Sequence, residues 1–225
     1  MAIEQEHPVR EAAVRVLGGT DPTLQRPPAD PATLVLPESL AARVRDFDRR
    51  VDGWFERIRG NPTADRLFYG ASAVGDFSLI WHIAGAARAL GGARQEREAV
   101  RLGASLGIES VLVNGVVKSF FRRTRPDRAQ LTARQARKLR KPKSSSFPSG
   151  HATSGFMAAS LLSQGRPLRS KVFWYGAATI VAASRVHVKI HHPSDVVAGA
   201  AVGVGLGAAA KRLWPLGNAH APRGH

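Results

Sequence analysis

Residues 172–213 read VFWYGAATIVAASRVHVKIHHPSDVVAGAAVGVGLGAAAKRL. Two apolar runs, 172–188 and 196–213, flank a short polar stretch that carries two adjacent histidines and an aspartate. Each run approaches the ~20 residues with which an α-helix crosses a bilayer. Small residues dominate the second run, and its Gly199-x-x-x-Gly203 spacing is typical of closely packed helices. The stretch therefore predicts two helices joined by a polar turn, with packing as the expected role of the glycines.

Three further apolar segments precede this stretch, at residues 68–90, 99–121 and 151–162. Small and polar residues dilute each of them, and no internal repeat or alternating strand pattern is present. The sequence therefore predicts an all-α fold, a multi-pass transmembrane helix bundle of about five spans. A buried, soluble helical bundle is the alternative that the apolar segments alone leave open.

Two acidic residues, Asp76 and Glu109, fall inside predicted spans. An ionisable group within a span is a functional candidate by default. Salt bridges to Arg101 or Arg88 are an equally good interpretation of both residues.

The segment before the first span has a different pattern. Between residues 39 and 59, apolar side chains recur at helical spacing among many arginines. This pattern predicts an amphipathic helix that lies in a membrane interface or docks on the rest of the protein. The expected organisation is an irregular segment at 1–37, the amphipathic helix at 38–66, a membrane core at 67–214 and a tail at 215–225.

Composition narrows the possible chemistry. The 33 Lys and Arg residues exceed the 17 acidic residues by 16, which suggests an anionic partner. The chain has no cysteine, so disulfides, thiolate catalysis and cysteine-ligated metals are excluded. No long apolar core marks a cleavable signal peptide in the first thirty residues.

Three short polar stretches lie where apolar segments meet loops. They are Lys118 to Arg125-Pro126, Pro148-Ser149-Gly150-His151, and Ser184-Arg185 followed by His191 and Asp195. If the spans alternate in direction, the ends of the second and fourth and the starts of the third and fifth share one face. Chain direction alone therefore predicts that the three stretches meet.

The residue types in these stretches suit phosphate chemistry. Lys118, Arg125 and Arg185 would supply three cations, and arginine offers a planar fork for phosphate oxygens. Ser149 and Gly150, just before a helix, would add backbone N–H groups and the positive end of a helix dipole. Phosphoryl transfer depends mainly on positioning and on neutralising phosphate oxygens.

Two histidines and one carboxylate complete the set. The imidazoles of His151 and His191 suit proton transfer or nucleophilic attack near neutral pH. Asp195, four residues after His191, could hold one ring nitrogen and leave the other free to attack. The other histidines in the spans and loops, His82, His187 and His192, are expected to have structural roles.

The three stretches, K-x6-RP, PSGH and SR-x5-H-x3-D, resemble the signature of the type 2 phosphatidic acid phosphatase superfamily. Every specified position matches, in order, over residues 118–195. The resemblance implies a helical core and metal-independent hydrolysis without a cofactor. The first sixty or so residues lie outside it.

The resemblance also implies a role for each matched residue. His191 would be the nucleophile that takes the phosphoryl group, and Asp195 would orient it. His151 would protonate the leaving alcohol and then activate water. The phosphate would be bound by Lys118, Arg125, Ser149, Gly150 and Arg185.

A basic loop bears on partners and orientation. Residues 122–143 contain ten Lys or Arg and one acid, Asp127. Such a cluster could grip nucleic acid, but no aromatic interleaving or nucleic-acid module accompanies it, and anionic lipid headgroups are the better partner. The positive-inside rule predicts that this loop, and with it the catalytic face, is cytoplasmic in a bacterial plasma membrane. Many relatives in the family are thought to face outward.

We therefore expect an integral-membrane phosphatase that acts on a lipid or polyprenyl-linked phosphate. The alternatives are a soluble acid phosphatase or vanadium haloperoxidase with the same motifs, and a non-enzymatic basic scaffold. The expected substrate classes are phosphatidic acid, phosphatidylglycerophosphate, phosphatidylinositol phosphate, polyprenyl pyrophosphate and polyprenyl-linked sugar phosphate. Neither the choice among them nor the oligomeric state follows from the sequence.

Overall fold

The computed structural model describes residues 37–121, 123–128, 131 and 144–216. Within these residues all regular structure is helical, which confirms the predicted all-α class. The expected irregular segment at 1–37, most of the basic loop and most of the tail lie outside the described residues. The helices are α2 (Glu38–Glu56), α3 (Pro62–Val74), η1 (Asp76–Ser78), α4 (Leu79–Ala89), α5 (Ala93–Ser110), η2 (Val111–Val117), α6 (Lys118–Phe120), α8 (Gly150–Leu162), α9 (Leu168–His187) and α10 (Pro193–Leu213).

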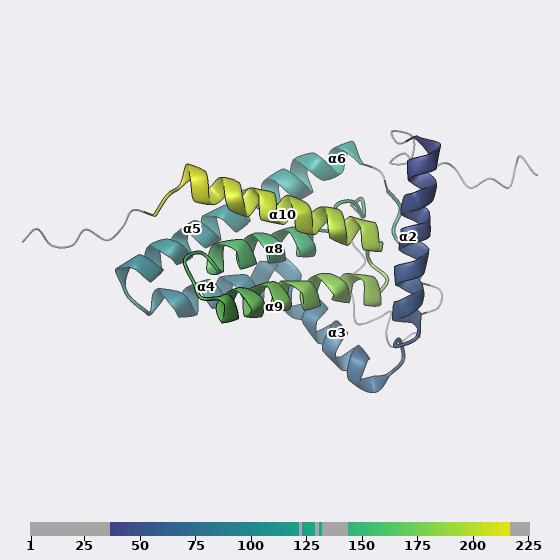
Figure 1. Cartoon of the computed structure of the whole chain (residues 1–225), viewed down its shortest axis with the longest axis horizontal. Helices are drawn as coiled ribbons and strands as arrows, with labels where there is room; N and C mark the ends of the chain where they lie inside the picture. Colours follow the sequence, from purple (N-terminus) through teal and green to yellow (C-terminus); the bar gives the residue numbers. More distant parts are fainter. Residues whose placement is uncertain (1–36, 122, 129–130, 132–143, 217–225) are drawn as a thin grey trace, which may run out of the picture.

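The bundle helices lie side by side and alternate in direction (Figure 1). The helix formed by α5, η2 and α6 runs toward α2, α8 runs away, α9 returns and α10 runs away again. Helix α2 stands across this end of the bundle. The three polar stretches of the sequence therefore share one end, as chain direction predicts.

Helix α8 forms the centre of the bundle. It contains no Asp, Glu, Lys or Arg, and ten of its thirteen residues are buried. Its side chains pack with Trp81 of α4 and Leu102 and Leu106 of α5 in the main apolar cluster. The start of α8 is therefore held rigidly at the end of the bundle where α2 lies.

Three glycines of α10 bring this helix close to α8. A Cβ atom built on Gly203 would lie 2.3 Å from the carbonyl oxygen of Thr153, and one on Gly199 would lie 2.6 Å from that of Ser149. Gly207 similarly faces Ser160. The glycines have the packing role that the sequence predicted, and they allow the first turns of α8 and α10 to touch.

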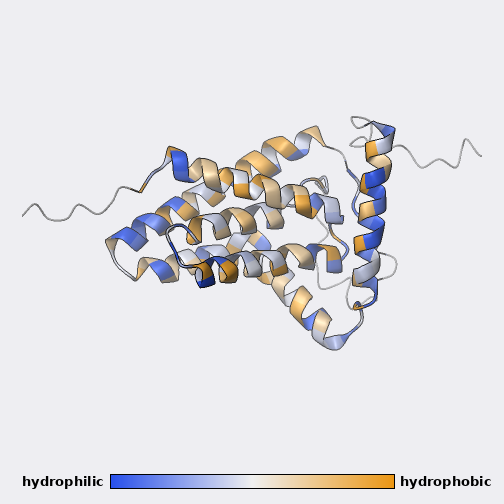
Figure 2. Cartoon of the chain, viewed as in Figure 1, coloured by the Kyte–Doolittle hydropathy of each residue, from blue (hydrophilic) through white to orange (hydrophobic). Residues whose placement is uncertain are grey.

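The outer surface of the bundle is largely apolar. The α5–η2–α6 helix (Ala93–Phe120) and α10 are long and apolar enough to cross a membrane, and only 33% and 17% of their apolar windows are buried in the fold. Figure 2 shows apolar residues along the bundle helices and hydrophilic residues in α2 and at the opposite end. A helix from a soluble core would instead bury most of its apolar window.

The segment at 68–90, which we expected to form one span, is two helices. Helix α3 ends at Val74 and α4 begins at Leu79, because Phe77 and Ser78 adopt left-handed backbone angles, with φ of 54° and 58°. Side chains of these types rarely adopt that conformation. Asp76 therefore lies in the break itself, between α3 and α4.

The close approach of α8 and α10 predicts a strong dependence on Gly203. In Gly203→Ala, the added methyl group would meet the α8 backbone, and we expect a loss of about 1–3 kcal/mol of stability. In the matched control Gly205→Ala, nothing lies within 4 Å of the new Cβ, so stability should stay equal or rise slightly. Thermal unfolding in detergent, followed by tryptophan fluorescence, measures both. Equal melting temperatures for the two variants would contradict the packing described here.

Candidate active site

The predicted nucleophile lies in the short loop between α9 and α10. The backbone N–H of His191 donates to the carbonyl of Arg185 at 3.1 Å, and its side chain is only 3% exposed. Its Nδ1 atom lies 3.6 Å from Oδ2 of Asp195, which is longer than a hydrogen bond but within ion-pair range. The same carboxylate oxygen accepts the N–H of His192 at 2.8 Å and so caps the start of α10. The helix start thus fixes Asp195 beside the imidazole.

The opposite ring nitrogen of His191 faces a guanidinium group. Nη1 of Arg125 lies 3.4 Å from His191 Nε2. The same guanidinium donates to the carbonyls of Ile190, Ser144 and Ser145 at 2.9–3.2 Å. Arg125 is therefore anchored by backbone oxygens while it points one nitrogen at the imidazole.

This environment keeps His191 neutral. Burial, followed by the charges of Arg185 and Arg125, lowers the pKa of His191 to about 3, although Asp195 opposes the shift. A neutral imidazole with its proton on Nδ1, toward the carboxylate, has a free electron pair on Nε2. That electron pair is what a nucleophile needs.

His151, in the first turn of α8, lies beside the break between α3 and α4. Its Nε2 atom lies 3.0 Å from Oδ1 of Asp76. Gly75 makes this approach possible, because a Cβ at that position would come within 2.8 Å of the His151 ring. The pairings that the sequence offered for Asp76 are not the ones formed: Arg88 lies 3.5 Å from Glu98 instead.

Arg185 links the His151–Asp76 pair with the surroundings of His191. It is buried, donates to the hydroxyl of Ser72 and lies 4.0 Å from Asp76. Its charge acts on both His151 and His191. Arg185 therefore lies among the residues that the sequence predicted to surround one phosphate.

Lys118 reaches the same place from the end of the α5–η2–α6 helix. Its Nζ donates to Asn114 Oδ1 at 2.8 Å, and a Cβ built on Gly150 would lie 3.7 Å from it. The Lys118 charge interacts with those of Arg125 and Arg185. Three cations thus gather at the start of α8.

Ser149 differs in one respect from its predicted role. It caps α8 by accepting the N–H of Ala152, but its own N–H donates to the carbonyl of Asp195 at 3.1 Å. This donor is therefore already used within the fold, and phosphate binding by Ser149 itself stays a prediction. The bond ties the PSGH stretch to the start of α10.

Several residues of the site belong to none of the three motifs. Ser72, Asn114 and Ser144 each hold one of the three cations. Asn114 could have been found as the residue one helical turn before Lys118, whereas the other two are brought in by tertiary contacts. Among the remaining histidines, His187 has the expected structural role, since it contacts Asp65 at 2.8 Å and stacks on Phe68.

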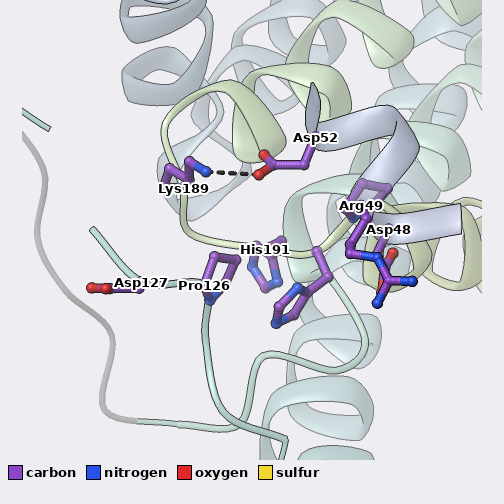
Figure 3. Close-up of a pocket in the computed structure, with 9 residues that line it drawn as sticks. Asp48, Arg49, Asp52, Pro126, Asp127, Lys189 and His191 are labelled. Carbon is purple, nitrogen blue, oxygen red and sulfur yellow. Dashed lines mark hydrogen bonds and ion pairs between the residues drawn. The ribbon is translucent and has the colours of Figure 1, made fainter. Parts of the chain in front are cut away.

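A cavity of about 290 Å³ opens on His191 from the side of α2 (Figure 3). Its lining residues are of polar type apart from two prolines. It comprises Asp48, Arg49 and Asp52 of α2, Pro126 and Asp127, and Lys189, His191, His192 and Pro193 around the α9–α10 loop. Helix α2 is therefore a wall of the space next to the predicted nucleophile. Within the described residues, no group of three or more His, Asp or Glu side chains is placed to hold a metal ion.

Comparison with known proteins agrees with the motifs. The family model of the PAP2 superfamily matches residues 98–217. Proteins from two strains of Mycobacterium tuberculosis, both named decaprenylphosphoryl-5-phosphoribose phosphatase, are 32% identical over 139 residues, which is 62% of this chain and 74% of the relative.

Two crystal structures share the fold. One is a transmembrane PAP2 type phosphatidylglycerolphosphate phosphatase from Bacillus subtilis, with a TM-score of 0.58 and 25% identity over 76% of this chain and 86% of that one. The other is Aquifex aeolicus LpxE, with a TM-score of 0.55 and 24% identity over 71% of this chain and 93% of that one. The chain therefore belongs to the PAP2 superfamily, as its three motifs predicted, and it is a phosphatase.

Proposed function

We propose that this enzyme hydrolyses a phosphate group on a membrane lipid or polyprenyl-linked substrate through a phosphohistidine intermediate, without a metal ion. The observation that carries the proposal is the neutral, buried His191, whose Nε2 lies 3.4 Å from Arg125 and whose Nδ1 faces Asp195. An imidazole held in this way has a nucleophilic nitrogen directed at a cation that can bind phosphate.

In the first step, the electron pair of His191 Nε2 attacks phosphorus and forms a P–N bond. The bond from phosphorus to the alcohol oxygen breaks, and His151 gives its proton to that oxygen. Asp76, 3.0 Å from His151, orients the acid. Lys118, Arg125 and Arg185, with backbone N–H groups at the start of α8, neutralise the phosphate oxygens.

In the second step, His151 takes a proton from water, and the water oxygen attacks phosphorus. The P–N bond breaks, the electron pair returns to His191, and inorganic phosphate leaves. Asp195 holds the ring in both steps because the carboxylate faces the nitrogen that keeps its proton.

The apolar surface of the bundle supports a substrate that lies in the membrane. Its two longest apolar helices expose most of their apolar residues, and the site lies at the end of the apolar band. We propose that this band is embedded as about five spans, counting the broken α3–α4 segment as one. The site would then lie at headgroup level, where a lipid phosphate is found.

Among lipid phosphates, a polyprenyl-linked pentose phosphate is the substrate class that we favour. The M. tuberculosis relatives are named for a decaprenylphosphoryl phosphoribose, and they match 62% of this chain. The Bacillus subtilis structure is named for phosphatidylglycerolphosphate, which makes that lipid the main competitor.

The proposed nucleophile is tested by His191→Ala. Purified protein in detergent with chelator should release phosphate from a lipid phosphate, and the substitution should reduce the rate by at least about a thousandfold. His82→Ala, in an exposed part of α4, is the matched control and should stay within about twofold of the wild type. Loss of activity on chelation, or activity retained without His191, would refute the mechanism.

The substrate class is tested with a panel of five lipid phosphates. Phosphatidic acid, phosphatidylglycerophosphate, phosphatidylinositol phosphate, polyprenyl pyrophosphate and polyprenyl-phosphoryl ribose 5-phosphate are compared by kcat/KM. We expect the polyprenyl-linked ribose phosphate to exceed the others by at least about tenfold, equivalent to ~1.4 kcal/mol in transition-state binding. A preference for phosphatidylglycerophosphate would overturn the assignment.

We also propose that α2 lies in the membrane interface on the cytoplasmic side. It stands across the bundle end and exposes Phe47 and Trp54, together with Arg43, Arg45 and Arg50. Helix α10 ends at the other end of the bundle from α2.

This orientation predicts that a reporter fused after His225 lies outside the cytoplasm. Alkaline phosphatase at that position should be active in whole cells, and green fluorescent protein should stay dark. The reverse result would place the catalytic face outside. Recovery of the enzyme in the soluble fraction without detergent would remove the membrane assignment altogether.

A further inference from the structure

Helix α2, which lies outside the three motifs, reaches the proposed catalytic carboxylate through one buried ion pair. Asp48 is only 7% exposed, and its Oδ2 accepts from Arg123 Nη2 at 2.7 Å. Arg123 donates through Nη1 to Asp195 Oδ1 at 2.6 Å. A continuous chain of contacts therefore runs from Asp48 through Arg123 and Asp195 to His191.

A second connection runs through the first turn of α10. Asp48 accepts the backbone N–H of Ser194 at 2.7 Å and its hydroxyl at 2.8 Å. The Ser194 hydroxyl in turn accepts from Arg123 at 2.7 Å. Because Ser194 directly precedes Asp195, Asp48 fixes both the backbone and the charge partner of that carboxylate.

The charges in this chain of contacts explain what Asp48 adds. Arg123 alone would neutralise Asp195, and a neutralised carboxylate is a weak partner for an imidazole. With Asp48 present, two carboxylates share one guanidinium, so the group of three carries a net charge of −1 next to His191. Formation of the P–N bond makes the ring cationic with its proton on Nδ1, and this residual negative charge stabilises it.

We propose that Asp48 is a positioning residue for the reaction: through Arg123 and Ser194 it sets the orientation and the effective charge of Asp195. The inference rests on the proposed role of His191 as nucleophile. It makes the N-terminal helix part of the catalytic apparatus, although it contributes no group that touches the phosphate.

The helix has independent anchors, so Asp48 can be changed without releasing it. Lys189 contacts Asp52 at 2.7 Å and Glu56 at 2.9 Å. Burial opposes ionisation of Asp52, but hydrogen bonds from Lys189 and Arg59 outweigh it and lower the pKa of Asp52. Arg59 also donates to the carbonyls of Val186 and His187 at 2.8–2.9 Å.

The test compares Asp48→Asn with Asp46→Asn in the same helix. Asp46 contacts Arg49 within α2, and its side chain is 46% exposed. With the panel lipid that the wild type hydrolyses fastest, Asp48→Asn should reduce kcat by about tenfold or more, because a charge-assisted contact is lost. KM should change by less than about threefold, and Asp46→Asn and Asp48→Glu should stay close to the wild type. Melting temperatures in detergent check that all variants fold.

Removal of Arg123 separates the charge effect from a loss of structure. If Arg123 neutralises Asp195 once Asp48 is absent, then Asp48→Asn/Arg123→Gln should have a kcat no lower than Asp48→Asn alone. If each substitution damages the structure independently, the loss of kcat in Asp48→Asn and the loss in Arg123→Gln should multiply in the double variant. Multiplied losses, a kcat unchanged in Asp48→Asn, or an equal loss in Asp46→Asn would overturn the proposal.

An activity-independent readout separates this inference from the proposed function. In ¹⁵N-histidine-labelled protein, assigned with His191→Ala, the wild type should show His191 with its proton on Nδ1. Asp48→Asn should lower the population of that tautomer. An unchanged tautomer would contradict the role of Asp48, whereas a wild type that releases phosphate from no lipid of the panel would contradict the proposed function instead.

Discussion

A buried imidazole between a carboxylate and a guanidinium is the arrangement on which the rest of this structure depends. Taking His191 out of water removes the ordinary stabilisation of its charged form, and the neighbouring arginines reinforce that effect. Only a rigid surrounding can keep such a ring in one orientation. The loop that carries it is short, is bonded back to Arg185 at its start and continues directly into the capped first turn of α10.

The bundle supplies this rigidity through close backbone contact more than through large side chains. Glycines at 199, 203 and 207 let α10 lie against α8, and the N–H of Ser149 consequently reaches the carbonyl of Asp195. The two helices that carry the proposed acid and the proposed carboxylate therefore begin at one point. Small residues in an apolar helix thus serve the site as well as the packing of the fold.

The sequence predicted the parts of the fold that depend on local pattern and chain direction. The helical class, the meeting of three distant stretches and the packing glycines follow from periodicity and spacing. The break at Asp76 could not be predicted, because Phe77 and Ser78 give no sign of a left-handed backbone. Arg123 occupies an unspecified position of its motif, and Asp48 lies 146 residues before its partner Ser194. Their contributions arise only from tertiary structure.

The anchoring of Arg125 has a consequence for how the enzyme would meet its substrate. A long, flexible cation on a surface must lose side-chain freedom each time it binds an anion, at a cost of about 1–2 kcal/mol. Here the carbonyls of Ile190, Ser144 and Ser145 immobilise the guanidinium before any ligand arrives. The entropy is lost once, when the chain folds, and little reorganisation remains for the moment of reaction. A lysine at this position would keep the charge but could not reproduce the planar set of donors that makes this preorganisation possible.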